Sequence, residues 1–220
     1  MKLAVISDVH CKWQKLQIPE VDLLISCGDY SFKGESWVVK DYHKWLNKQP
    51  AKHIISVQGN HELWVEKNFN EAKMIATEAC PRVHFIEEGL VEIDGIKIWC
   101  SAYTPWFHDW AYNVHRGAEM KKHWDKVPDD VNIMAVHGPP YGILDELVYV
   151  DGTPKGEFVG CADLYNRLKE LKELDLMFFG HIHGAFGEKH LDGVSYYNAS
   201  ICDEGYLPTN PITVVEYEKE

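Results

Sequence analysis

Short apolar runs alternate with longer amphipathic segments along much of the chain. Lys2–Ser7, Asp22–Ser26 and His53–Val57 are apolar runs bounded by polar residues, which is typical of buried strands. Between the second and the third run, Ser36–Gln49 carries apolar residues at helical spacing and is followed by Pro50. The order strand, helix, strand predicts βαβ units and a sheet with parallel strands.

The alternation continues to the end of the chain. Two Asp-Gly pairs predict hairpins over Leu90–Cys100 and Glu188–Asn198, because this dipeptide favours the tight turn between antiparallel strands. Thr104–Pro128 has no clear period, and we expect a long loop with short helical pieces, of the kind that often lines a site. The other predicted elements are the helices Asn70–Cys80 and Cys161–Leu174, the strands Val131–Val136, Leu176–Phe179 and Pro211–Tyr217, and a solvated acidic tail, Glu218–Glu220.

Composition places the chain among ordinary globular proteins. Its 220 residues are 45% hydrophobic and 25% charged, and no linker or repeat divides them, so we expect one domain over residues 1–220. The formal net charge of −12 argues against binding to long nucleic acids or to anionic membranes. Six cysteines without a C-x-x-C pair are expected to be reduced thiols. Neither a secretory signal nor an apolar membrane span is recognisable, which predicts a cytoplasmic protein.

Polar clusters follow five of the predicted strands directly. Ligand sites in open α/β sheets form outside the carboxyl ends of the strands. Unpaired Asp and His side chains at the end of a buried strand also need compensation for their lost hydration. The clusters are Asp8-Val9-His10, Gly28-Asp29, Gly59-Asn60-His61-Glu62, His137-Gly138-Pro139-Pro140 and Gly180-His181-Ile182-His183.

The spacing within these clusters suits a metal centre. Residues two apart in extended backbone project to the same face, so Asp8 with His10 and His181 with His183 can reach one site. The set of seven donors is too large for one ion that must leave room for substrate, and it fits two ions bridged by a carboxylate. Imidazole and oxygen donors without thiolate suit Mn²⁺, Fe, Zn²⁺ or Ni²⁺, of which we expect Mn²⁺. The candidate ligands are Asp8, His10, Asp29, Asn60, His137, His181 and His183.

Taken singly, each cluster is also typical of an ordinary turn, and the hypothesis depends on their order and number. The series resembles the calcineurin-like metallophosphoesterases from residue 3 to about residue 200. Further segments, including Thr104–Phe107, Trp110–Asn113 and Pro208–Pro211, resemble the branch of metallophosphoesterase-domain-containing proteins, near the class III cyclic-nucleotide phosphodiesterases. The resemblance implies an α/β (α+β) fold, a sandwich of two mixed β-sheets flanked by α-helices.

The resemblance also implies a role for each candidate residue. One ion would be held by Asp8, His10, Asp29 and His183, and the other by Asp29, Asn60, His137 and His181, with Asp29 bridging. Some animal members of the branch have glycine where this chain has His181, so the histidine implies a complete second metal site. His61 would face the substrate without binding metal, and Glu62 is expected to orient a ligand histidine.

The expected activity is hydrolysis of a small nucleotide phosphodiester by in-line attack of a hydroxide held between the two ions, with His61 protonating the leaving group. Trp106, Phe107, Trp110 and Tyr112 offer surfaces on which a base could stack, or they simply pack the loop, and Arg116 is available for phosphate. The alternatives are a phosphomonoesterase acting on small molecules or phosphoproteins and, in another class, a metal-binding scaffold without activity.

Overall fold

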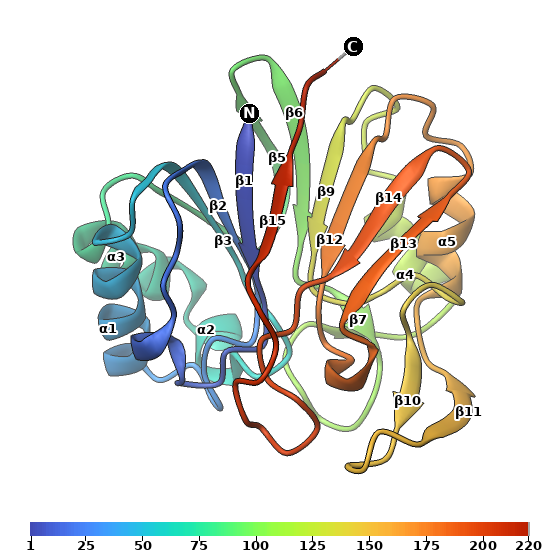
Figure 1. Cartoon of the computed structure of the whole chain (residues 1–220), viewed down its shortest axis with the longest axis horizontal. Coiled ribbons are helices and arrows are strands. Elements are labelled where there is room, and N and C mark those ends of the chain that lie inside the picture. Colours follow the sequence, from blue (N-terminus) through green and yellow to red (C-terminus); the bar gives the residue numbers. More distant parts are fainter. Residues whose placement is uncertain (220) are drawn as a thin grey trace.

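Two mixed β-sheets pack face to face in the computed structural model, which describes residues 1–219 (Figure 1). The first sheet has the strand order β15-β1-β2-β3-β4 and comprises β1 (Lys2–Ile6), β2 (Val21–Cys27), β3 (Ala51–Val57), β4 (Val83–Ile86) and β15 (Thr213–Glu216). The second has the order β13-β14-β12-β9-β6-β5 and comprises β5 (Glu88–Ile93), β6 (Ile96–Ser101), β9 (Ile133–Val136), β12 (Leu176–Phe179), β13 (Gly187–Leu191) and β14 (Val194–Asn198).

Helices cover the outer faces of both sheets, which gives four layers (Figure 1). The first sheet is covered by α1 (Ser36–Asn47), α2 (Leu63–Lys67) and α3 (Phe69–Ala79), and the second by α4 (Ala118–Trp124) and α5 (Ala162–Leu168). This arrangement confirms the predicted sandwich of two mixed sheets. None of the helices within residues 1–219 combines the length and the apolar character needed to cross a bilayer.

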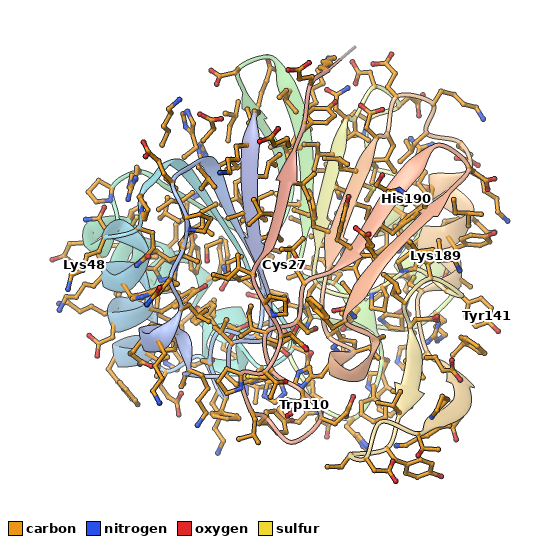
Figure 2. All side chains as sticks on the ribbon, in the orientation of Figure 1. Cys27, Lys48, Trp110, Tyr141, Lys189 and His190 are labelled. Carbon is orange, nitrogen blue, oxygen red and sulfur yellow. The ribbon has the colours of Figure 1, made fainter. Side chains whose placement is uncertain are left out.

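The layering explains why the central strands are apolar without alternation. In β1, Leu3 and Val5 join the core between the two sheets, whereas Ala4 and Ile6 join the core beneath the helices of the first sheet. A strand with both faces buried needs apolar residues at every position. Cys27 lies in the interior between the sheets, whereas Lys48, Lys189 and His190 lie at the periphery (Figure 2).

Parallel pairing brings the carboxyl ends of several strands to one end of the molecule. β1, β2, β3 and β4 run parallel, as do β6, β9, β12 and β14, while the edge strands β15, β5 and β13 are antiparallel. Trp110 lies at the end where these strands finish (Figure 2). A two-stranded hairpin of β10 (Glu146–Val148) and β11 (Pro154–Phe158) projects from the same end (Figure 1).

Both predicted Asp-Gly hairpins are confirmed. Asp94 and Gly95 have φ of 51° and 78°, and Asp192 and Gly193 have φ of 52° and 86°. Positive φ at both central positions is the type I′ turn that suits the twist of the flanking strands. The loop expected at Thr104–Pro128 contains only the short strands β7 (Thr104–Pro105) and β8 (Asn113–Val114) besides α4, as the missing period indicated.

Other expectations were incomplete. The helix predicted over Cys161–Leu174 ends at Leu168. Leu171 and Leu174, in the irregular segment that follows, stay buried because they pack in the same core cluster as α5. The helix predicted to end at Gln49 stops at Asn47. Neither β4 nor the β10–β11 hairpin was predicted. All five residues of β11 are exposed, so no apolar pattern marks that strand, whereas β4 is a short apolar run that was overlooked. Of the expected acidic tail, Glu220 lies outside the described residues.

Candidate metal centre and adjoining pocket

The predicted polar clusters meet at one end of the two sheets. Asp8 and His10 follow β1, Asp29 follows β2, and Asn60 and His61 follow β3. From the second sheet, His137 follows β9, and His181 and His183 follow β12. Their side chains form three overlapping groups in which the candidate ligand atoms lie within 4.8 Å of one another: Asp8, His10 and His183; His10, Asp29 and His61; and Asp29, His137 and His181.

Backbone strain is concentrated in these turns. Asp8, His10, Asp29 and His181 have φ of 52°, 38°, 52° and 69°, a left-handed region that residues other than glycine seldom adopt. Such strain costs on the order of 1–3 kcal/mol at each residue and is concentrated at functional sites in proteins. The turns after these strands therefore aim side chains inward at the expense of stability.

Hydrogen bonds from outside the groups set the orientation of three imidazoles. Nδ1 of His10 lies 3.1 Å from the Ser31 carbonyl oxygen, and Nδ1 of His137 lies 2.8 Å from that of Cys27. For His183 the Nδ1 partner is the carbonyl of Asp203, at 3.0 Å. A backbone carbonyl accepts a hydrogen bond, so each Nδ1 carries the proton and Nε2 faces the group, as in most histidine ligands of metals.

Asn60 connects the two rings of the third group, His137 and His181. Its Oδ1 lies 2.8 Å from Nε2 of His137 and 2.7 Å from Nδ1 of His181. Nδ1 of His181 therefore faces the group, beside Nε2 of His137. The amide oxygen and the two imidazoles converge on one point, which fits the ligand set expected for a second ion.

Asp8 and Asp29 each direct one oxygen into the groups. Oδ2 of Asp8 accepts hydrogen bonds from the backbone N–H of His181 at 2.9 Å and from Ser200 Oγ at 2.8 Å, while Oδ1 is buried without a hydrogen-bond partner. Oδ1 of Asp29 accepts the N–H of His61 at 2.9 Å, and Oδ2 lies 3.3 Å from His137 Nε2. Asp8 Oδ1 lies 3.4 Å from His183 Nε2, so the buried oxygen and the imidazole face the same point. Carboxylate oxygens and imidazole nitrogens that converge in this way fit divalent metal ions.

Glu62 has a different role from the one expected. It contacts no candidate ligand histidine through its carboxylate. Oε2 accepts the N–H groups of Asp29 at 2.9 Å and Gly59 at 2.8 Å, and Oε1 accepts the N–H of Ser31 at 3.1 Å and its hydroxyl at 2.8 Å. Four donors satisfy this fully buried carboxylate, which thereby ties the turn after β2 to the turn after β3.

Charges within the groups are strongly coupled. Burial opposes ionisation, yet Asp29 raises the pKa of His137 and Asp8 raises the pKa of His183, each to about 9. Burial alone would raise the pKa of the Asp8 and Asp29 carboxyl groups. Attraction to His183 outweighs this effect at Asp8, and attraction to His137 outweighs it at Asp29, so both pKa values are lowered. Burial lowers the pKa of His10 and of His181 to about 4. Without metal, two imidazolium ions thus balance the two carboxylates near neutral pH.

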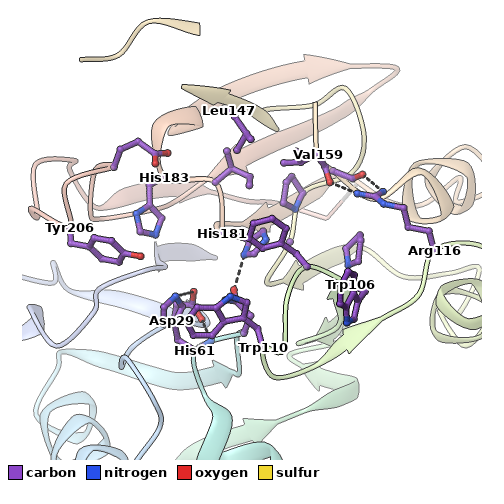
Figure 3. Close-up of a pocket in the computed structure, with 18 residues that line it drawn as sticks. Asp29, His61, Trp106, Trp110, Arg116, Leu147, Val159, His181, His183 and Tyr206 are labelled. Carbon is purple, nitrogen blue, oxygen red and sulfur yellow. Dashed lines mark hydrogen bonds and ion pairs between the residues drawn. The ribbon is translucent and has the colours of Figure 1, made fainter. Parts of the chain in front are cut away.

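His61, a member of the second group, also lines a pocket. Its Nδ1 lies 3.2 Å from the Phe32 carbonyl oxygen, and its ring lies 4.3 Å from that of Trp110 between centroids. Nε2 is 4.0 Å from Asp29 Oδ2. The ring is therefore held from outside, with Nε2 facing both the carboxylate and the pocket (Figure 3).

The pocket has a volume of about 310 Å³ (Figure 3). It opens directly onto the three overlapping groups of Asp and His side chains listed above, which we call the metal-capable groups. Trp106, Phe107 and Trp110 form an aromatic wall, of which Trp106 and Phe107 are 52% and 60% exposed. Tyr112 was expected to offer a similar surface, but it is 1% exposed and packs in the interior, so it cannot stack on a ligand.

Arg116 lies on the pocket wall, where it was expected, but its guanidinium is engaged. Nη1 donates to the Gly160 carbonyl at 2.7 Å and Nη2 to the Val159 carbonyl at 2.6 Å (Figure 3). These bonds attach the segment that follows β11 to the pocket. Contact between Arg116 and a phosphate remains a prediction, and it would have to use the guanidinium donors that these carbonyls leave.

Five pocket residues were missed in the sequence, two of which, Val159 and Gly160, lie in the segment after β11. Leu147 comes from β10, and Glu204 and Tyr206 come from the loop after β14. A signal for the loop was present, because Cys202-Asp203-Glu204-Gly205 is a polar cluster shortly after an apolar strand, like the five clusters above.

Comparison with known proteins gives a consistent result. The model of the calcineurin-like phosphoesterase family matches residues 1–185. Metallophosphoesterase domain-containing protein 1 of Homo sapiens is 30% identical over 234 residues, covering 98% of this chain and 70% of the human protein. A UPF0046 protein of Caenorhabditis elegans is 27% identical, covering 96% of this chain and 74% of its own length.

Solved structures share the fold at low identity. The phosphopantetheinyl hydrolase of Mycobacterium tuberculosis is similar with a TM-score of 0.63 and 14% identity, covering 93% of this chain and 90% of that chain. An archaeal phosphodiesterase is similar with a TM-score of 0.51 and 18% identity, covering 100% of this chain and 96% of that chain. Both likenesses concern the fold alone.

Proposed function

Because the chain belongs to the calcineurin-like phosphoesterase family, we propose that it is a metal-dependent phosphodiesterase that hydrolyses small nucleotide phosphodiesters. The observation that carries the proposal is the pocket of about 310 Å³, in which an aromatic wall adjoins the metal-capable groups. If the phosphoryl group of a substrate lies at the metal-capable groups, one of its ester substituents can lie against Trp106 and Phe107.

In this proposal one ion is held by Asp8, His10, Asp29 and His183, and the other by Asp29, Asn60, His137 and His181. When bound, the ions supply activation of water and neutralisation of phosphoryl charge. Mn²⁺ is our first candidate, with Fe, Zn²⁺ and Ni²⁺ as alternatives, because the donors are nitrogen and oxygen.

The chain's own residues supply orientation and a proton. The carbonyl-bound Nδ1 atoms of His10, His137 and His183 fix three rings with Nε2 inward. His61 has its Nδ1 on the Phe32 carbonyl, so in its protonated form the Nε2–H faces the pocket and can protonate the departing alkoxide.

The preference for diesters follows from charge. A phosphate monoester carries almost two negative charges near neutral pH, and a diester carries one. Outside the metal-capable groups, the charged residues lining the pocket are Arg116, which is bonded to two carbonyls, and Glu204. The pocket therefore offers little to balance a second phosphate charge, which favours a monoanionic diester.

One assay separates this function from its alternatives. The protein is stripped of metal, and bis(p-nitrophenyl) phosphate and p-nitrophenyl phosphate are compared with Mn²⁺, Zn²⁺, Ni²⁺ or Fe²⁺ added back. We expect metal-dependent turnover with a higher kcat/KM for the diester. Preference for the monoester would support a phosphatase instead, and metal binding without turnover of either compound would support a scaffold.

A further inference from the structure

A tyrosine outside the predicted clusters covers one side of the metal-capable groups. The centroid of the Tyr206 ring lies 4.8 Å from that of His10 and 5.3 Å from that of His183. The plane of the Tyr206 ring is nearly perpendicular to the plane of each imidazole. The residue is 40% exposed and lines the pocket together with Asp29 and His61. Tyr206 therefore borders both the donor set and the space for a ligand.

The loop holds this tyrosine in an unfavourable conformation. Tyr206 has φ of 58°, in the left-handed region that residues with a side chain seldom adopt. The N–H groups of Gly205 and Leu207 donate to Asp203 Oδ1, each at 2.9 Å, and the Tyr206 N–H donates to the Asp203 carbonyl at 2.9 Å. Such strain persists only where the surroundings enforce it.

The same loop is attached to the metal-capable groups. The Asp203 carbonyl also accepts the hydrogen bond of His183 Nδ1, at 3.0 Å. In addition, Glu204 Oε1 accepts the N–H of Gly184 at 2.9 Å, directly after that histidine. The position of Tyr206 is thus fixed relative to His183 through two short connections.

The hydroxyl of Tyr206 is free to bind a ligand. Within residues 1–219 no group forms a hydrogen bond with it, and it points into the pocket (Figure 3). Trp106 and Arg116 lie toward the other end of the pocket, beyond His181 (Figure 3). A ligand group that meets the phenol is therefore the part bound at the metal-capable groups, and a protonated phenol donates to anionic oxygen.

We propose that Tyr206 is a substrate-contacting residue whose hydroxyl donates a hydrogen bond to a phosphoryl oxygen of the ester bound at the metal-capable groups. The inference rests on the proposed function for the identity of that ester. It adds a neutral donor at the end of the pocket where the phosphoryl group would otherwise meet the metal ions and His61. The contact orients the phosphoryl group and strengthens binding of phosphate itself.

The test uses Tyr206→Phe, which keeps the ring and removes the hydroxyl, with Tyr141→Phe as the matched control. Tyr141 is 47% exposed and does not line the pocket. Binding of inorganic phosphate to the Mn²⁺-loaded full chain is measured by calorimetry, together with metal content, Tm, and kcat and KM for bis(p-nitrophenyl) phosphate. We expect about tenfold weaker phosphate binding and a similar fall in kcat/KM for Tyr206→Phe, with metal content and Tm unchanged.

The outcomes separate this inference from the proposed function. Unchanged phosphate affinity and kcat/KM in Tyr206→Phe would overturn the inference, as would loss of metal from that variant or an equal effect of Tyr141→Phe. Absence of measurable phosphate binding to the loaded wild type would overturn it as well. Weaker phosphate binding in Tyr206→Phe, beside a wild type that turns over no phosphoester, would support the contact and contradict the proposed function.

Discussion

His61 is anchored from outside the metal-capable groups, by the Phe32 carbonyl and the Trp110 ring, so its removal leaves the other donors in place. We therefore expect His61→Ala to bind two ions and to lose about 10²–10⁴ in kcat on diesters with an alkoxide leaving group. The loss should be smaller for p-nitrophenolate, which departs without protonation. Metal content by mass spectrometry and kcat on both substrate types check this, with His190→Ala as control. Loss of metal from His61→Ala would contradict the assignment of His61 as an acid.

Glu204 tests the charge argument for diester preference. Replacing it with glutamine keeps an oxygen that can accept the Gly184 N–H and removes one negative charge from the pocket. A charge interaction of about 1 kcal/mol corresponds to a factor of about five. The ratio of kcat/KM for a monoester to that for a diester should thus rise about fivefold in Glu204→Gln. Glu157→Gln, on exposed β11, should leave the ratio unchanged, and an unchanged ratio in Glu204→Gln would remove charge as the source of selectivity.

At the level of residues, chemical type and position were enough to predict which polar side chains come together but not every orientation. Asp8, Asp29 and the four candidate histidine ligands were identifiable because unpaired polar groups directly after buried strands need partners. The direction of the Glu62 carboxylate depends on which N–H groups the neighbouring turns leave free, and no pattern in the sequence encodes that. Tyr112 was misplaced for a similar reason, because only the fold determines which aromatic rings of an irregular loop face inward.

At the level of elements, the turns after the strands need glycine because backbone and side chains approach closely there. A Cβ on Gly180 would collide with the Asp8 carboxylate and the Ser7 hydroxyl, and one on Gly59 would collide with the Asp29 carboxylate. A side chain at either position would therefore displace a candidate ligand carboxylate.

Gly180→Ala should therefore displace Asp8 and weaken metal binding at least about tenfold, because misplaced ligands lose affinity. Gly193→Asn is a suitable control, since Gly193 occupies a type I′ turn with φ of 86° and no atom lies within 4 Å of its Cβ position. Calorimetric titration of the metal-free wild type and both variants with Mn²⁺ measures the difference in metal affinity. Equal affinity of Gly180→Ala and wild type would show that the turn after β12 adjusts to the extra carbon.

The elements that were predicted share a strong pattern, and the β10–β11 hairpin, which was missed, lacks one. Buried strands and Asp-Gly hairpins have a defined period and turn chemistry. All residues of β11 are exposed, so the sequence of this strand has no hydrophobic alternation that would indicate which side of the hairpin faces the pocket. The attachment of the hairpin through Arg116 depends on contacts between residues more than 40 positions apart.

At the level of the whole molecule, the metal-capable groups join the two sheets. Asp8, His10 and Asp29 come from the first sheet, and His137, His181 and His183 from the second. Since each proposed ion takes donors from both sheets, metal binding should resist their separation and raise Tm. Addition of a chelator to the loaded protein should lower Tm, whereas an unchanged Tm would show that the ions bind too weakly to stabilise the fold.

The pH dependence of this stabilisation has a definite sign. In the metal-free protein His137 and His183 have pKa values of about 9, above the ordinary value of 6.5, so their contribution to stability is complete below pH 6.5 and is lost as pH rises through 9. His10 and His181, with pKa values of about 4, disfavour the folded state as pH falls below 6.5. The combined contribution of these four histidines to the stability of the metal-free protein should therefore be greatest near pH 6.5.

Metal binding reverses the trend on the alkaline side. The ions need neutral imidazoles, so binding displaces the protons of His137 and His183 and becomes more favourable as pH rises toward 9. The difference in Tm between Mn²⁺-loaded and chelator-treated protein should therefore widen from pH 6.5 to 9, because the metal-free form loses stability while the loaded form binds more tightly. Thermal unfolding in matched buffers across this range measures it. A difference that stays constant or narrows would mean that these two histidines do not exchange protons for metal.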